Sequence, residues 1–307
     1  MIELPVGVWV EAVVDFLRAH GGVVFDGLSE LTLALVNAIY LALVLPHPLV
    51  VTAVLAGLTW LATRRWLPPA LAAARFLLIM VMQLWDPTMQ SLAVVLLASV
   101  VAIVIGVPIG IAAAQMDRVR TLMRPVLDFM QTLPVFVYLL PAVFFFGIGV
   151  VPGVVATTIF AIPPAVRLTE LGIRQVDSEV VEAAVAFGSR PRQVLRDVQL
   201  PLAMPSIMAG VNQVIMLALS MVVIAGMVGG GGLGAVVVQA VTTLDIGKGF
   251  EGGLAVVIVA IYLDRVTAAF GARGVRLRRR RTSPRRPTIS ETVDPPASRP
   301  VAEAAAR

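Results

Sequence analysis

Long runs without charge alternate with short charged segments along most of this chain. Four uncharged stretches cover residues 31–63, 87–116, 129–166 and 198–244. Each exceeds the roughly 20 apolar residues that a helix needs to cross a bilayer. Helices suit this environment because every backbone polar group is satisfied within the helix. The pattern therefore predicts an all-α, polytopic transmembrane bundle.

Turn residues divide the longer stretches into separate crossings. Pro46 and Pro48 fall near the middle of the first stretch. Glycine and proline at 147–153 interrupt the third, and the glycine run 229–232 ends the membrane part of the fourth. We predict about 8 crossings, with about 3 in an N-terminal scaffold and about 5 in a core. Their expected bounds are 29–45, 46–63, 68–85, 90–115, 126–148, 150–167, 206–228 and 251–270.

Composition excludes most soluble classes. The 307 residues are 58% hydrophobic and 14% charged, whereas soluble domains have roughly 45–50% apolar and about 25% charged residues. The chain has no cysteine, which excludes disulfides and thiolate metal sites. Only two histidines, His20 and His47, are available for a metal centre or a catalytic triad. We therefore expect no cofactor, no bound metal and no catalytic residue.

The isoelectric point of 10.6 is explained by the C-terminal segment. Residues 271–307 contain ten arginines and three acidic residues, and the remaining chain contains fourteen basic and sixteen acidic residues. The segment is rich in Pro, Ser and Ala without an apolar face, which predicts a disordered tail. Its arginines lack the interleaved aromatic residues of a nucleic-acid surface. We expect membrane lipid as its partner and no nucleic acid.

The arginines also predict the topology. With eight crossings, one side of the membrane receives the arginines at 64–65, 118–124 and 167–196 together with the tail, and the other side receives only Lys248. Cytoplasmic loops carry the excess of Lys and Arg. The sequence thus predicts a multi-pass plasma-membrane protein whose C-terminus is cytoplasmic.

The N-terminus has no basic segment of the kind that begins a secretory signal. Residues 8–20 place Trp9, Val13, Phe16 and Leu17 on one helical face. This spacing predicts a helix that lies in the membrane interface, with an ordinary soluble cap helix as the alternative.

One predicted cytoplasmic segment differs from a simple connector. Residues 167–205 form the longest polar stretch between crossings, whereas connections in compact domains usually have about 4–6 residues. Residues 177–187 read as a capped amphipathic helix that Gly188 ends. A second short helix is expected at 191–199, and the Leu-Pro pair at 200–201 should end it. Two short helices that meet at a glycine suit docking into a partner.

This loop carries a spaced signature. A Glu-Ala-Ala triplet is followed after three residues by glycine and after nine more by Val-Gln-Leu-Pro. The spacing resembles the EAA signature of importer-type ABC transporter permeases, with Val198 where that family has Ile. The resemblance implies that the loop couples the bundle to a cytoplasmic ABC ATPase subunit. The implied coupling residues are Glu182, Ala183, Ala184, Gly188, Leu200 and Pro201.

Further motifs are similar to the glycine betaine/proline branch of this family. They lie at 131–134, 162–169, 172–177, 219–225 and 231–234. The resemblance covers roughly residues 85–270 and implies a type I ABC importer permease fold. It also implies a second permease copy, an extracytoplasmic substrate-binding protein, and an osmolyte such as glycine betaine, proline, choline or carnitine as substrate. The expected domains are an N-terminal segment (1–28), a scaffold (29–86), a permease core (87–270) with its coupling loop (168–205), and the tail (271–307).

Two sequence patterns resemble nucleotide-binding motifs but lack the surrounding sequence that such motifs need. The run 229–234 formally fits G-x-G-x-x-G, but it follows a membrane helix and not the strand of a βαβ unit. A flexible extracytoplasmic bend is the better reading. Lys248 lacks the frame of a P-loop. We therefore expect no enzymatic activity in this chain and ATP hydrolysis in a separate subunit.

Polar residues within the predicted spans are candidates for the translocation pathway. They are Gln131, Thr132, Asn212 and Ser220. Hydrogen bonding between helices is the more common role of such residues. The spans hold no ring of carboxylates that would relay protons, which disfavours a secondary carrier. The alternatives are a permease for another small solute such as an amino acid and, less favoured, a secondary carrier or a receptor.

Overall fold

The chain forms a bundle of helices joined by short loops. The computed structural model describes residues 6–282, and this part of the chain contains no strand. The predicted all-α class is confirmed. The helices are α1 (Val6–Val44), α2 (Pro48–Thr63), α3 (Leu67–Val81), α4 (Trp85–Gln115), α5 (Asp117–Thr132), α6 (Val135–Phe146), α7 (Val150–Arg174), α8 (Ser178–Ala186), α9 (Pro191–Gln193), the π-helical turn η1 (Val194–Gln199), α10 (Leu200–Gly226), α11 (Gly232–Thr243) and α12 (Ile246–Thr282).

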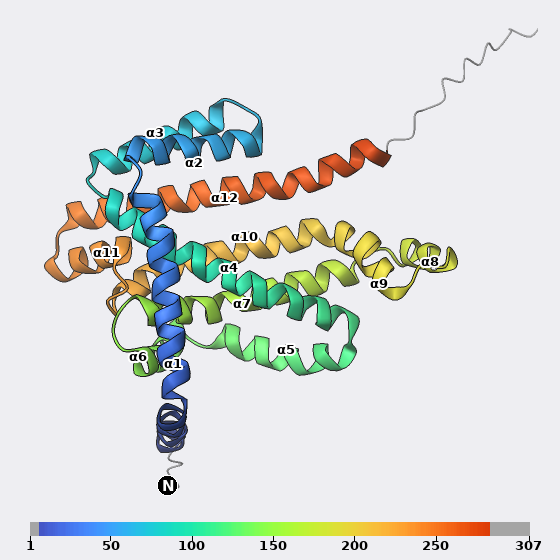
Figure 1. The fold of residues 1–307 in the computed structure, drawn as a ribbon, viewed down its shortest axis with the longest axis horizontal. Helices are drawn as coiled ribbons and strands as arrows, with labels where there is room; N and C mark the ends of the chain where they lie inside the picture. Colours follow the sequence, from blue (N-terminus) through green and yellow to red (C-terminus); the bar gives the residue numbers. More distant parts are fainter. Residues whose placement is uncertain (1–5, 283–307) are drawn as a thin grey trace, which may run out of the picture.

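Within residues 6–282, five helical segments are long and apolar enough to cross a membrane, or six if the bent pair α5–α6 counts as one. About 8 crossings were expected, and the difference lies mainly in α2 and α3. These helices have 16 and 15 residues, which is about 24 and 22 Å of helix against a hydrocarbon core of about 30 Å. They form a hairpin beside α12 (Figure 1).

The N-terminal region differs from the prediction. A separate interfacial helix at 8–20 and a span at 29–45 were expected, but α1 is one continuous helix from Val6 to Val44. Prolines occur only outside it, at Pro5 and Pro46, so nothing within the segment forces a break. Helix α1 runs across α4 and also contacts α6 and α7, and the long axes of α4, α7 and α10 lie side by side (Figure 1).

The predicted span 126–148 is broken. α5 begins at Asp117, and the chain bends by 94° between α5 and α6. Leu133 has an extended backbone with ψ 135° directly before Pro134. A proline disfavours helical geometry in the residue before it, which explains the break.

Small residues bring the central helices close together. A Cβ atom at Gly106 of α4 would lie 2.6 Å from the Cβ of Ala165 on α7, and one at Gly172 of α7 would lie 2.6 Å from the Cβ of Ser206 on α10. Such close approach is typical of helix packing in membranes, where dispersion contacts replace the hydrophobic effect. Helix α7 thus packs tightly between α4 and α10.

Helix α12 continues into the predicted tail. The helix extends to Thr282, so residues 271–282 are helical, contrary to the predicted disorder from residue 271. Arg, Leu and Ala favour helix, and Pro284 is the first proline after the span. The rest of the predicted tail, 283–307, lies outside the described residues, as do residues 1–5.

Candidate functional site

The predicted docking loop forms a two-helix elbow, which we define as residues 177–201. It projects beyond the ends of α4, α7 and α10 (Figure 1). The carboxylate of Asp177 accepts a hydrogen bond from the Glu179 N–H at 3.0 Å and caps α8. Gly188 follows α8 with φ +82°, a backbone conformation that residues other than glycine rarely adopt. The predicted capped helix and glycine turn are confirmed.

The second arm of the elbow does not end where predicted. The Arg190 N–H donates to the side-chain oxygen of Gln193 at 2.9 Å and starts α9. The π-helical turn η1 then leads directly into α10, so the helix continues through Leu200 and Pro201. Pro201 lacks an N–H and its ring crowds the preceding turn. The wider π turn immediately before it lets the helix pass the proline without a break.

Helix α8 presents an apolar surface outside the bundle. Phe187 is 92% exposed, Val185 56% and Val180 43%. Glu182 and Ala183 are also exposed, and no residue of this fully described helix is buried. Large exposed apolar side chains among charged residues are typical of a contact surface for another protein.

The base of the elbow is fixed to the bundle. Val194 is 5% exposed, and Leu195 and Leu200 pack against a buried cluster around Ile173. The Gln115 side-chain amide at the end of α4 donates to the Gln199 oxygen at 3.2 Å. The tip of the elbow is therefore exposed, while its base is packed against α4, α7 and α10.

An ion-pair cluster joins α5 to the end of α7, just before the elbow. Arg120 Nε lies 2.8 Å from Glu170 Oε1, and Arg174 lies 2.6 Å from Asp117 Oδ1. The Glu170 side chain is only 12% exposed and also faces Arg174 Nε at 3.7 Å. A further pair joins Arg167 and Asp128. The prediction missed this cluster, although its α7 residues share one helical face at positions 167, 170 and 174.

The four pathway candidates have different environments. The Asn212 amide donates to Asp264 Oδ1 at 2.9 Å and lies 2.8 Å from the Thr267 hydroxyl, which donates to its oxygen. Both ends of this amide are thus used to join α10 to α12. Ser220 is exposed, and its hydroxyl donates to the Met216 carbonyl at 3.0 Å.

The other two candidates, Gln131 and Thr132, are exposed at the end of α5. They lie just before the bend between α5 and α6. The Thr132 hydroxyl donates to the Phe129 carbonyl within the same helix at 3.1 Å.

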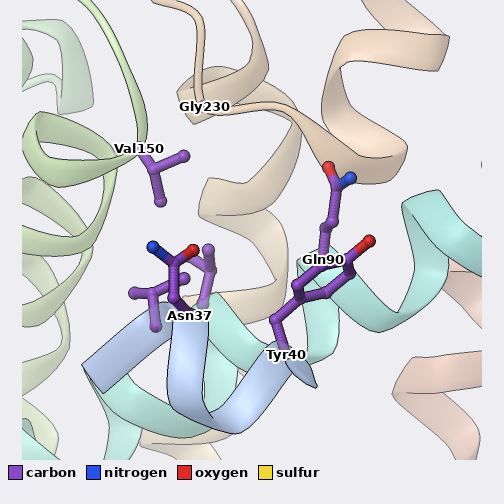
Figure 2. A pocket seen from close by; sticks show the side chains of 7 residues that line it. Asn37, Tyr40, Gln90, Val150 and Gly230 are labelled. Carbon is purple, nitrogen blue, oxygen red and sulfur yellow. The ribbon is translucent and has the colours of Figure 1, made fainter. Parts of the chain in front are cut away.

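At the end of the bundle opposite the elbow, α1, α4, α7 and the glycine loop enclose a pocket of about 240 Å³ (Figure 2). None of the four pathway candidates lines it. The Tyr40 hydroxyl donates to Asp86 at 2.5 Å, and the Gln90 amide donates to the same carboxylate at 2.9 Å. The residues that line the pocket are Val36, Asn37, Tyr40, Gln90, Val94, Val150 and Gly230.

The glycine run beside this pocket begins α11. The Gly232 N–H donates to the Gln90 oxygen at 2.9 Å, and the Leu233 N–H donates to the Ser91 hydroxyl at 2.8 Å. The run follows a helix and not a strand, as expected for a bend and not for a dinucleotide loop. Side chains of α4 fix this bend, whereas a flexible one was predicted.

A bundle of apolar helices with an exposed elbow at the end of its central helices is the arrangement of a polytopic membrane protein. Residues 106–274 match the family described as "Binding-protein-dependent transport system inner membrane component". The chain belongs to this family, and the prediction of an ABC importer permease located in the membrane is confirmed.

Curated relatives cover most of the chain. It is 51% identical over 265 residues to the glycine betaine transport system permease protein OpuAB of Bacillus subtilis (strain 168), covering 86% of this chain and 94% of the relative. It is 46% identical over 269 residues to the glycine betaine/proline betaine transport system permease protein ProW of Escherichia coli (strain K12), covering 87% and 75%. The predicted resemblance to the glycine betaine/proline branch is confirmed.

A solved structure has the same fold. Inward-facing MetNI, a methionine ABC transporter, aligns with a TM-score of 0.56 at 21% identity and covers 60% of this chain and 92% of the solved one. The likeness confirms the predicted fold of an ABC importer permease.

Proposed function

We propose that this chain is the membrane subunit of an importer for glycine betaine or a closely related osmolyte such as proline betaine, carnitine or choline. The observation that carries the substrate class is the 46–51% identity, over most of the chain, to permeases named for glycine betaine transport. The methionine transporter is 21% identical and supports the fold alone. An amino-acid permease is therefore the weaker alternative.

The importer draws its energy from a separate cytoplasmic ABC ATPase subunit that binds the elbow. Three observations support this step. Phe187 and Val185 are exposed at the tip, Glu182 is available for a basic partner side chain, and Gly188 sets the angle between the two arms. The buried base of the elbow then transmits movement to α7 and α10 because packed helices move as rigid bodies.

Three further partners complete the proposed assembly: a second copy of the chain, an extracytoplasmic binding protein and anionic membrane lipid. A second copy of the chain encloses the solute path, and an extracytoplasmic binding protein delivers the solute. The arginines at 273–281 lie on the continuation of α12. Arginines beside a membrane favour the cytoplasmic face and anionic lipid. The C-terminus is accordingly cytoplasmic in this proposal.

Uptake by the reconstituted complex tests the proposal. The chain, its ATPase and its binding protein are placed in liposomes with ATP on the ATPase side, and entry of radiolabelled glycine betaine is followed. We expect saturable, ATP-dependent uptake that proline betaine or choline inhibits and methionine does not. Uptake that methionine inhibits, or uptake driven by an ion gradient without ATP, would contradict it.

A further inference from the structure

One side of α10 is exposed along its whole length. The exposed residues recur at intervals of seven, four and three positions, which places them on one face of a helix with 3.6 residues per turn. Within the described chain, no other helix covers this face, whereas the opposite face is buried against α7. We call it the α10 stripe. Its residues are Leu202, Ala209, Gln213, Met216, Ser220 and Met227.

Gln213 is out of place on a surface that faces lipid. It lies in the middle of α10, at the depth of the bilayer centre if α10 crosses the membrane. Among residues 6–282 its amide has no hydrogen-bond partner, whereas the adjacent Asn212 amide donates to Asp264 and accepts from Thr267. An unpaired amide is costly in hydrocarbon, so polar residues within membrane helices face a cavity or a bundle interior.

The rest of the stripe allows passage of a polar solute. Ser220 adds a hydroxyl two turns from Gln213, and Met216 and Met227 are 50% and 56% exposed. The stripe has no charged side chain. An uncharged lining suits a zwitterion, because neither the carboxylate nor the quaternary ammonium end can be held by an ion pair. Methionine side chains are flexible and polarisable, so they adapt to the irregular apolar surface that methyl groups present.

We propose that the α10 stripe lines the solute path and that the Gln213 amide contacts the solute carboxylate during passage. This inference rests on the proposed function. The inference assigns Gln213, and not the predicted Asn212, to the solute path, and it retains Ser220. Packing of the stripe against the second copy or against lipid is the competing arrangement.

Cysteine labelling tests whether the stripe faces water. The chain has no cysteine, so Gln213→Cys provides a single thiol. Val257→Cys is the matched control because Val257 is 51% exposed near the middle of the α12 span. The probe is a membrane-impermeant trimethylammonium-ethyl methanethiosulfonate, applied to the complete complex in membranes. We expect Gln213→Cys to react at least about tenfold faster than Val257→Cys, since thiolate forms only where water reaches.

A labelling rate at Gln213→Cys equal to that of the control would overturn the inference, because lipid or the second copy would then cover the stripe. This result is independent of the substrate. If the parental complex fails to import glycine betaine but Gln213→Cys is labelled, the proposed function fails and the path assignment stands.

A charge substitution tests contact with the solute. Gln213→Glu keeps the shape of the side chain and places a carboxylate opposite the solute carboxylate. We therefore expect glycine betaine uptake to fall about tenfold, which is the scale of losing a hydrogen bond to a charged group. Gln213→Asn keeps the amide and should retain most uptake. Complex assembly and binding-protein affinity should be unchanged in both. Parental uptake by a fully assembled Gln213→Glu complex would contradict the contact.

Discussion

The two ends of the bundle use glycine in opposite ways. At the elbow, Gly188 has φ +82° and no atom lies within 4 Å of the position of its missing Cβ. At the other end, Gly232 has φ +61°, and a Cβ there would lie 2.4 Å from the Ser91 hydroxyl oxygen and 3.1 Å from the Pro87 carbonyl. Glycine is thus required at the elbow turn by backbone conformation alone. In the glycine loop it is required both by backbone conformation and by the crowding of neighbouring atoms. The turn at one end is open to its surroundings, and the other end is fixed within the chain.

The largest expected effect comes from filling the crowded position. Gly232→Val adds a left-handed backbone penalty to a clash, and we expect a loss of about 3–5 kcal/mol of stability. Gly188→Val meets only the backbone penalty of about 1–2 kcal/mol. Thermal unfolding of both variants in lipid nanodiscs measures the difference. Equal destabilisation would remove the distinction between the two ends.

The next effect is functional. Gly188→Pro cannot adopt φ +82° because proline fixes φ near −65°. We expect ATP-dependent uptake to fall to below about a tenth, corresponding to about 1.4 kcal/mol or more of lost coupling, with insertion unchanged. Gly188→Asn is the control, because asparagine tolerates left-handed geometry. Full uptake by Gly188→Pro would contradict a role for the turn.

A charge change on the elbow should have a smaller effect. Glu182→Lys reverses an exposed charge without disturbing packing, so we expect ATPase binding to weaken and uptake to fall several-fold, about 1 kcal/mol, with unchanged thermal stability. Glu251→Lys makes the same change at an exposed position near the start of α12 and should leave ATPase binding intact. Similar losses of ATPase binding in both variants would indicate a general charge effect.

A further effect, on stability alone, concerns the anchor of the glycine loop. Ser91→Ala removes the acceptor for the Leu233 N–H. We expect a loss of about 1–2 kcal/mol, because a buried donor is left unpaired. A lower midpoint of thermal unfolding checks this. No change would mean that the Ser91 hydroxyl does not stabilise the loop.

The elbow could be predicted because its signals are local. Features that depend on long-range contacts could not be predicted from the sequence. Asp177 and Gly188 act on their immediate neighbours, so sequence spacing gave both ends of α8 correctly. The break at Pro134 was hidden because it lies within an uncharged stretch longer than one span. The partners of Asn212 and the Arg120 partner of Glu170 lie on other helices, and a single sequence does not specify which faces meet. The π turn before Pro201 likewise depends on the packing of Leu195 and Leu200, which overrides the local proline signal. Helix α1 is continuous because no proline interrupts it.

The central claim is that the tip of the elbow binds a separate ATPase. Binding of that ATPase to the permease in nanodiscs, measured for Phe187→Asp, tests it most directly. Val241→Asp is the control, because Val241 is 66% exposed at the opposite end of the bundle. We predict at least a tenfold weaker interaction for Phe187→Asp, as for a buried aromatic anchor, and parental binding for Val241→Asp. Parental ATPase binding by Phe187→Asp would contradict the account.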